Sequence, residues 1–306
     1  MARALELTSW LGVSISHPGE WELAIASGPD EPGRCTFTDR HYHRLNIQWR
    51  KVKQPPKLEL LLEKYRHSDK GQLRELSPLT SLPAGWVGLL RKAAEEGVVT
   101  YATKVFTLCE PLLLAEVTLV WPKEQQRDAA LEAAILKSVA AESSAWPRLW
   151  QAMGLSLDLP RPFDLRRNDS KVGRVSWEFA APGHTIPPFV VQRLALPEYW
   201  IKGSLMDWMK KQVPAGHKAV KEEAAVVNGH PAWRLISRGR ADLWSSLRGR
   251  RLLRLDLAWL CPQESRVYHL ITHRTSRTEE PALPEGLVIR CCRPVPQVRP
   301  GKVRKA

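Results

Sequence analysis

The sequence lacks the features that would place it in a membrane or a secretory pathway. No apolar run reaches the roughly 18–20 residues of a membrane-spanning helix. The N-terminal stretch MARALELTSWLGVSISHPGEW has neither a long apolar core nor a small-residue cleavage site. We therefore predict neither a transmembrane helix nor a signal peptide.

Cysteine is also scarce and scattered. The chain has five cysteines, an odd number, and they follow no framework spacing: Cys35, Cys109, Cys261, Cys291 and Cys292. Small secreted proteins stapled by disulfides show dense, even-numbered cysteines, so this pattern favours a reducing cytoplasm.

Signature motifs of catalysis are absent as well. We find no G-x-S-x-G for a nucleophile elbow, and no G-x-x-x-x-G-K-[ST] or G-x-G-x-x-G for a phosphate-binding loop. Glu222 and Glu223 are adjacent, so on a strand their carboxylates would point to opposite faces. We predict no catalytic residue, no cofactor and no enzymatic activity; because a fold does not fix function, an enzyme with a site of a new kind is a further alternative.

Histidine and cysteine occur in two suggestive places, but neither has metal-site spacing. His41 and His43 would share a strand face with Cys35 upstream, yet no fourth ligand is placed by spacing. Cys291 and Cys292 are adjacent rather than C-x-x-C, so we interpret them as packing residues of a strand. His269 and His273 would face the same side of a strand without an H-E-x-x-H pattern. The sequence therefore predicts no metal site.

What the sequence does contain is enough apolar residue for two folded units. Its 306 residues are 43% apolar and 25% charged, which is ordinary for a globular chain, and its 13 tryptophans suit the packed faces of sheets. We predict a first unit over residues 1–145, a second over 146–294 and an unfolded basic tail over 295–306.

The two predicted units resemble each other along the sequence. Three pairs of segments align in order at a shift of 140–142 residues: SISHPGEWEL (14–23) with SLDLPRPFDL (156–165), GRCTFTD (33–39) with GRVSWEF (173–179), and LLLAEVTLVWP (112–122) with LLRLDLAWLCP (252–262). Each unit also has one predicted helix between the second and third segments, PPKLELLLEKYRH (55–67) and KGSLMDWMKKQV (202–213). We infer a tandem repeat.

Hydrophobic periodicity predicts a sheet in each unit. Leu45, Ile47 and Trp49 alternate with polar residues, as on a strand with one buried face. Asn228-Gly229 is a strong signal for a two-residue hairpin turn. The tryptophans at strand positions (Trp49, Trp121, Trp177, Trp259) are predicted to pack against sheet faces. The predicted fold class is α+β: two repeat units, each a twisted antiparallel sheet packed with helices.

The order of these segments resembles the PsbP-like fold. The cadence runs P-x-x-W/F-x-L, then G-R-x-x-F/W, a helix and a long strand ending in W/C-P, and it covers most of both halves. That resemblance implies an α/β sandwich. Members of the family are mostly accessory, binding or assembly proteins, so it also implies a non-catalytic role and assigns no functional residue.

Charge distinguishes the two halves. Residues 1–145 contain 18 Lys+Arg and 18 Asp+Glu, whereas residues 146–306 contain 28 and 14, so the whole net charge of +14 belongs to the second half. Arginines concentrate in the stretch SRGRADLWSSLRGRRLLR, which we interpret as strand, exposed loop and strand; the candidate binding residues there are Arg238, Arg240, Trp244, Arg248, Arg250, Arg251 and Arg254.

Three interpretations of this basic stretch are open: solvated charge, a face for an acidic protein, or a face for nucleic acid. Guanidinium groups suit carboxylates and phosphates, and Trp244 could fill a pocket or stack on a base. No nucleic-acid-binding motif is present. We therefore predict a cytoplasmic, non-enzymatic accessory or adaptor protein that binds an acidic protein partner through its second unit. RNA or DNA binding by the same face is the alternative.

Overall fold

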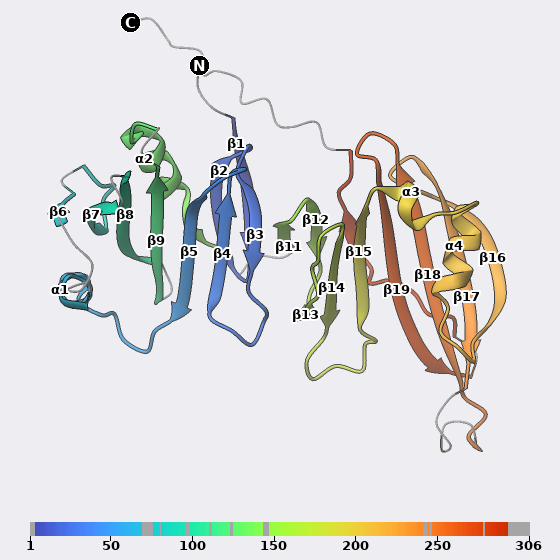
Figure 1. Ribbon diagram of the computed structural model, residues 1–306. Coiled ribbons are helices and arrows are strands. Elements are labelled where there is room, and N and C mark those ends of the chain that lie inside the picture. The colour runs from blue at the N-terminus through green and yellow to red at the C-terminus, as the bar shows by residue number, and fades with distance from the viewer. Residues whose placement is uncertain are drawn as a thin grey trace, which may run out of the picture. The chain divides into compact units, whose positions relative to one another are not determined.

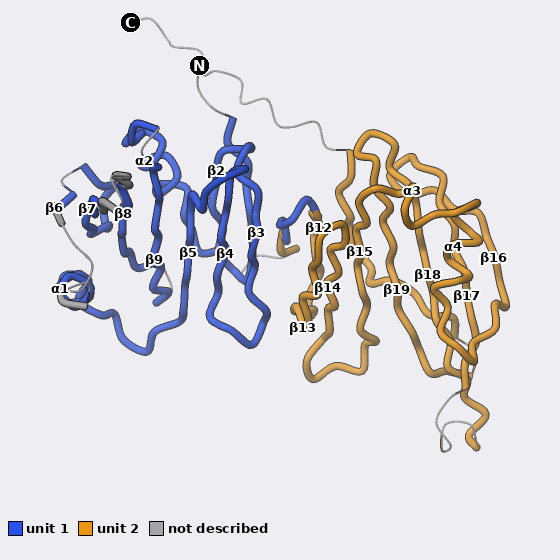
Figure 2. Tube along the Cα trace, viewed as in Figure 1, with its two compact units in different colours: residues 1–145, 150–154 blue, residues 146–149, 155–306 orange. Residues whose placement is uncertain are grey.

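Strands make up most of the secondary structure in both units of the chain. A computed structural model describes residues 4–292 apart from 69–75, 80, 96–97, 110–111, 123–124, 143–146, 241–243, 245–246 and 278. The first unit contains residues 1–145 and 150–154, and the second contains 146–149 and 155–306 (Figure 2). The predicted boundary after residue 145 did not anticipate that Trp150–Gly154 belongs to the first unit. The predicted tail, 295–306, lies outside the described residues.

The first unit is built around a seven-stranded antiparallel sheet in the order β3-β4-β5-β9-β8-β7-β6 (Figure 1). A smaller layer pairs β10 with β2 and β2 with β1. The element bounds are β1 (Leu5–Trp10), β2 (Val13–Pro18), β3 (Glu22–Ala26), β4 (Gly33–Thr38), β5 (His43–Lys51), α1 (Leu58–Ser68), β6 (Leu76–Pro78), β7 (Trp86–Glu95), β8 (Val98–Cys109), β9 (Leu113–Trp121), α2 (Ala129–Ser138) and β10 (Ala140–Ala141).

Alternation along β5 positions the core of this unit, as the sequence predicted. Leu45, Ile47 and Trp49 are buried, whereas Gln48 and Arg50 are exposed. The helix α1 packs on β7 and β8, with its predicted apolar stripe half-buried. Because one face of the sheet is covered and the other is partly solvated, period-two alternation is visible in the sequence.

Two buried charged side chains are integrated into the same core. The guanidinium of Arg44 lies between the rings of Trp21 and Trp121, 5.2 and 5.0 Å from their centroids. The carboxylate of Glu132, on α2, accepts hydrogen bonds from Thr103, from the indole of Trp121 and from Arg127 (2.5–3.0 Å). Such charges are tolerated in a core only when they are paired, so these two are structural.

The second unit is built around another seven-stranded antiparallel sheet, in the order β13-β14-β15-β19-β18-β17-β16. The strand β12 (Leu155–Leu159) precedes this sheet in the chain and pairs with β20, whereas most of β11 (Arg148–Ala152) belongs to the first unit, where Gln151 pairs with Ser9 of β1. The other bounds are β13 (Asp164–Asn168), β14 (Arg174–Ala180), β15 (Phe189–Ala195), α3 (Pro197–Trp200), α4 (Leu205–Gln212), β16 (Lys218–Val227), β17 (His230–Gly239), β18 (Arg251–Cys261), β19 (Arg266–Ser276) and β20 (Val288–Ile289).

The helix α4 covers one face of this sheet (Figure 1). Ser204 caps its first turn by accepting a hydrogen bond from the backbone N–H of Asp207 (3.0 Å). Met206, Trp208 and Met209 then pack against Leu235 and sheet neighbours from β15, β18 and β19. Asn228 and Gly229 form the predicted turn between β16 and β17, both with positive φ (52° and 78°).

The two large sheets have the same strand order when each is counted from its first strand. In each sheet the first three strands of the chain lie side by side in sequence order. The last strand of the sheet in the chain, β9 or β19, follows them, and the other three strands continue from it in reverse sequence order. The first two aligned segment pairs fall on equivalent elements, β2–β3 with β12–β13 and β4 with β14. Origin of the two units from one repeated sequence stays a prediction.

The third aligned segment pair was wrong by one strand. Residues 112–122 form β9, which pairs with β5, whereas residues 252–262 form most of β18, which lies one position further along its sheet and pairs with β19. The positional equivalent of β18 is β8 (Val98–Cys109). Long apolar strands that end in a Trp-Pro or Cys-Pro pair resemble one another whatever their place in a sheet, because burial on both faces selects similar residues.

The predicted α+β fold class gave the helices too large a part. Strands dominate both units, and the helices are few and short, so helices do not form the layer that an α+β description implies. Trp49, Trp121, Trp177 and Trp259 are buried, as predicted. No helix among the described residues is long and apolar enough to cross a membrane. The likeness to PsbP-like proteins stays a prediction.

Candidate functional site

The predicted arginine-rich stretch lies at one end of the β17–β18 pair. β17 ends at Gly239 and β18 begins at Arg251. We call the described exposed residues of this region the arginine tip; they are Arg238, Arg240, Trp244, Leu247, Arg248, Arg250 and Arg251. Residues 241–243 and 245–246 of the stretch lie outside the described residues.

The arginine tip combines arginines that no described carboxylate neutralises with exposed apolar surface. Trp244 is 73% exposed and Leu247 71% exposed, which is unusual for side chains of their size. A backbone hydrogen bond forms a turn that links Trp244 with Arg248: the N–H of Arg248 donates to the carbonyl of Trp244 (3.2 Å). The side chain of Arg277 donates to the carbonyl of Arg248 (2.5 Å) and so attaches the turn to the end of β19.

Most other arginines of the second unit already have acidic partners. Such pairs include Arg174 with Asp169, Arg234 with Glu223 and Glu280, and Arg290 with Asp158. By contrast, no described acidic side chain lies within salt-bridge distance of the tip guanidinium groups of Arg238, Arg240, Arg248, Arg250 and Arg251. These five arginines therefore contribute charge that no described carboxylate neutralises.

One predicted binding residue, Arg254, is directed into the unit. Its guanidinium makes two hydrogen bonds to the carboxylate of Asp256, Nε to Oδ2 at 2.8 Å and Nη2 to Oδ1 at 2.7 Å. Asp256 is fully buried and Arg254 is only 14% exposed. Successive side chains of β18 point to opposite faces, so Arg254 lies on the other face from Leu253. The prediction that Arg254 is an exposed binding residue was therefore wrong, because its guanidinium pairs with Asp256 inside the unit.

The buried Asp256 also holds His269 of the neighbouring strand. Oδ1 of Asp256 lies 2.8 Å from Nε2 of His269, and Nδ1 of that ring faces Oε1 of Gln192 at 3.3 Å. The indole of Trp208 packs edge-on against the imidazole. Burial works to raise the pKa of Asp256, but hydrogen bonds from His269 and Arg254 outweigh it and leave that pKa below its usual value.

This Asp-His pair is not arranged for nucleophilic catalysis. Both nitrogens of His269 face Asp256 or Gln192, and neither has a described serine or cysteine as its partner. A base of a catalytic triad needs one nitrogen directed at the nucleophile. The group is better explained as a satisfied polar network under α4. The sequence had found no carboxylate for His269 because Asp256 comes from a different strand.

A second cluster, which the sequence interpretation missed, joins His230, Cys261, Cys291 and Cys292. Their imidazole nitrogen and three sulfurs all lie within 4.8 Å of one another. Nε2 of His230 is 2.8 Å from Sγ of Cys292, which is 3.0 Å from Sγ of Cys261. We call these four residues the thiol cluster.

The prediction that Cys291 and Cys292 pack within a strand was wrong. β20 ends at Ile289, and the two cysteines follow it in irregular backbone, with Cys292 at a positive φ of 58°. That left-handed conformation turns the chain so that both thiols face the same centre. Burial and the neighbouring thiols raise the pKa of Cys292 to about 12. No spacing motif connects positions 230, 261 and 291, so only the adjacent cysteines could have hinted at the cluster.

The other sequence candidate for metal binding is not assembled. Cys35 is buried on β4, where burial raises the pKa of its thiol, whereas His43 is exposed at the start of β5. Cys35 faces Ile47 across the sheet, and His43 faces Thr38. These residues do not form a group of converging ligand atoms among those described.

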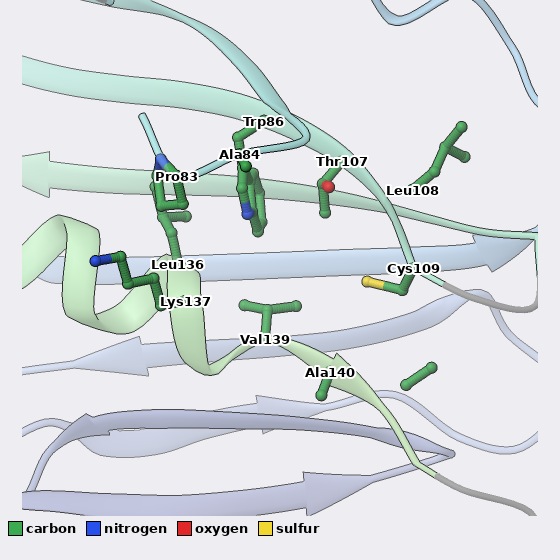
Figure 3. Close-up of a pocket in the computed structure, with 11 residues that line it drawn as sticks. Pro83, Ala84, Trp86, Thr107, Leu108, Cys109, Leu136, Lys137, Val139 and Ala140 are labelled. Carbon is green, nitrogen blue, oxygen red and sulfur yellow. The ribbon is translucent and has the colours of Figure 1, made fainter. Parts of the chain in front are cut away.

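The first unit has an open pocket of about 550 Å³ where β7 and β8 approach the end of α2 (Figure 3). Trp86, Leu136 and Val139 line it together with Thr107 and Cys109. The hydroxyl of Thr107 donates to the carbonyl of Gly85 (2.8 Å), and burial raises the pKa of the Cys109 thiol. The pocket offers an apolar wall and a protonated thiol, without converging charged groups that would orient a ligand.

Comparisons with known proteins identify no family. No protein-family model matches the chain, and no curated protein matches it. Among solved structures, it is similar to the immunity protein TplEi of T6SS from Pseudomonas aeruginosa complexed with "L" peptide. The TM-score is 0.38 at 12% identity, over 91% of this chain and 90% of that one.

Two further solved structures are similar at the same level. They are the apo form of the same immunity protein and the Tle4-Tli4 complex, each with a TM-score of 0.38 at 14% identity, over 92–93% of this chain and 90–92% of the other. Identity and TM-score are both too low for these likenesses to assign a function.

Proposed function

We propose that this protein is a non-enzymatic binding protein that holds an acidic protein partner on the arginine tip of its second unit. The observation that carries the proposal is the contrast in pairing: most other described arginines of the unit are neutralised by neighbouring carboxylates, whereas those of the tip face solvent without a described acidic partner. Unpaired guanidinium groups side by side repel one another, and a complementary acidic surface would relieve that repulsion.

The exposed apolar residues favour a protein partner over plain solvation. Arginine and tryptophan are enriched at the energetic centres of protein interfaces, because both combine a large contact area with directed polar groups. Trp244 and Leu247 lie in the same turn as Arg248 and are largely exposed. Exposed apolar groups that lie together and are rimmed by polar residues are typical of protein-interaction sites.

A charge-reversal experiment tests the tip. The triple variant Arg248→Glu, Arg250→Glu and Arg251→Glu reverses exposed charge at the start of β18. A matched control, Arg167→Glu, Lys202→Glu and Lys211→Glu, makes the same change in net charge at exposed sites elsewhere in the unit. Each form is used to purify partners from extracts of the native cell with and without nuclease treatment, and a recovered partner is then titrated as a purified protein.

We expect wild type and control to recover the same protein and the tip variant to bind it at least about tenfold more weakly, since losing charge-assisted contacts costs roughly 1.5–3 kcal/mol each. Equal binding by the tip variant would overturn the assignment. Binding that disappears with nuclease would instead support nucleic acid as the partner. In that case the affinity for duplex DNA should fall with salt, with a log–log slope of about −0.9 per phosphate contacted.

A further inference from the structure

The thiol cluster has the composition of a closed metal site. It offers three cysteine sulfurs and one imidazole nitrogen from His230, and such a Cys₃His set is one of the standard ligand sets of structural zinc. Thiolate sulfur prefers soft or borderline ions such as zinc and disfavours magnesium or calcium, which require oxygen. The chemistry of the donors therefore points to one class of ion.

The dimensions of the cluster also suit a single ion. With Zn–S near 2.3 Å and Zn–N near 2.0–2.1 Å, the ligand atoms of a tetrahedral site lie roughly 3.5–3.8 Å apart. All four atoms here lie within 4.8 Å of one another, and the two shortest separations are 2.8 and 3.0 Å. Movements of less than about 1 Å would open the cluster to that geometry, which ordinary side-chain rotation supplies.

The ligands are held by rigid elements and by neighbouring polar groups. His230 is the first residue of β17 and Cys261 the last of β18, so two adjacent strands fix their separation. Asn228 donates from its side-chain amide to Sγ of Cys291 (3.3 Å) and to the carbonyl of Ile289 (2.7 Å). The backbone N–H of Cys292 donates to the carboxylate of Glu264 (2.9 Å). Such outer contacts are what orient metal ligands.

A disulfide is the alternative use of paired cysteines, and the geometry disfavours it. Sγ of Cys261 and Sγ of Cys292 are 3.0 Å apart, about 1 Å longer than a covalent S–S bond, and all five cysteines of the chain are free. A disulfide would also leave the third thiol and the imidazole without a role. The thiol of Cys292 also donates to Oε1 of Gln263 (2.6 Å), but a hydrogen bond between two groups does not require all four ligand atoms to converge, whereas a bound ion does.

We propose that His230, Cys261, Cys291 and Cys292 bind one Zn²⁺ ion that fastens the chain after β20 to the ends of β17 and β18. Binding would replace three thiol protons with three Zn–S bonds, so metal uptake releases protons to solvent. The site is closed: four protein ligands leave no open position for a substrate, so the role is structural. It lies at the far end of β17 and β18 from the arginine tip and is independent of the proposed partner.

Metal analysis of the purified full-length protein tests the site. Elemental mass spectrometry should find about one zinc per chain in wild type and in Cys109→Ser, because Cys109 is a thiol of the first unit outside the cluster. Cys292→Ser should bind at least about tenfold less zinc, since the loss of one thiolate opens the site. Wild-type zinc content retained in Cys292→Ser would overturn the proposal.

Two measurements on the wild-type chain avoid dependence on the folding of a variant. Titration of the protein with a mercurial thiol reagent should release one zinc per chain, detected with a chromophoric chelator. Replacement with Co²⁺ should give thiolate-to-cobalt charge transfer and the intense visible bands of a tetrahedral site. Absence of both signals, another metal in the cluster, or a Cys261–Cys292 disulfide in a non-reducing peptide map would each overturn the assignment.

Discussion

The two ends of the β17–β18 pair differ sharply although the same two strands supply both. At the end where β17 begins and β18 finishes, His230 and Cys261 are buried and meet two further thiols. At the other end, Arg240 and Arg250 are exposed and have no described acidic partner. A ten-residue strand separates these ends by about 30 Å.

Burial, and not residue type, decides which of the two ends is structural. The segment after β20 covers the first end, so soft ligands there are removed from water and can share an ion. Nothing among the described residues covers the tip, so its guanidinium groups keep their hydration and stay available to a partner. Between the two ends, Arg254 and Asp256 form a buried ion pair that belongs neither to the arginine tip nor to the thiol cluster.

The largest effect should follow removal of metal from the thiol cluster. We expect a strong zinc chelator to lower the unfolding midpoint of the second unit by roughly 10–20 °C, at 2–4 °C per kcal/mol for a unit of this size. Hydrogen–deuterium exchange should rise in β17, β18 and β20 but not in β3–β5 of the first unit, which serves as the internal control. If the chelator left hydrogen–deuterium exchange in β17, β18 and β20 unchanged, or raised it equally in β3–β5, the expectation would be contradicted.

The next largest effect should come from the middle of the strands. Replacing Asp256 with Ala leaves Arg254 and His269 buried without their partner, which should cost about 3–5 kcal/mol in the free energy of unfolding. The control Glu222→Ala removes an exposed pair with Lys210 and should cost at most about 1 kcal/mol. Urea denaturation followed by circular dichroism measures both, and a smaller loss for Asp256→Ala than for the control would refute the ranking.

A pH dependence should accompany this internal pair. The pKa of Asp256 is lower in the folded chain than in the unfolded one, because the bonds from His269 and Arg254 outweigh its burial. Its contribution is therefore fully present above the unfolded pKa of about 4 and is lost as pH falls through the folded value. Melting temperatures between about pH 3 and 6 should fall more steeply on acidification for wild type than for Asp256→Asn. Parallel curves would show that Asp256 does not titrate in this way.

The smallest effect on stability should come from the tip. Charge reversal at Arg248, Arg250 and Arg251 should change the free energy of unfolding by no more than about 0.5 kcal/mol, because these side chains are exposed and unpaired among the described residues. Urea denaturation of the triple variant measures this. A loss of several kcal/mol would mean that the tip is part of the packed unit and that its binding phenotype reports unfolding.

Local sequence patterns predicted several elements of the fold. The alternation of Leu45, Ile47 and Trp49 predicted a strand with one buried face, and Asn228-Gly229 predicted the β16–β17 turn. These predictions succeeded because strand alternation and positive-φ turns depend on neighbours within a few residues. Matching residues 112–122 with 252–262 failed because strand order is a long-range property that similar apolar strands do not encode individually.

By itself, the sequence determined where charge accumulates, which segments become strands and how net charge differs between the two units. Net charge is a sum over residues, and strand patterns depend on near neighbours, so neither requires the tertiary structure. Only the tertiary structure decided which charges are neutralised and which thiols meet. Arg254 and Arg250 belong to one arginine cluster in the sequence, yet strand alternation and a carboxylate two residues away commit Arg254 to the interior. His230, Cys261 and the adjacent Cys291 and Cys292 converge because strand pairing and the turn after β20 bring together three places in the chain that are 30 or more positions apart.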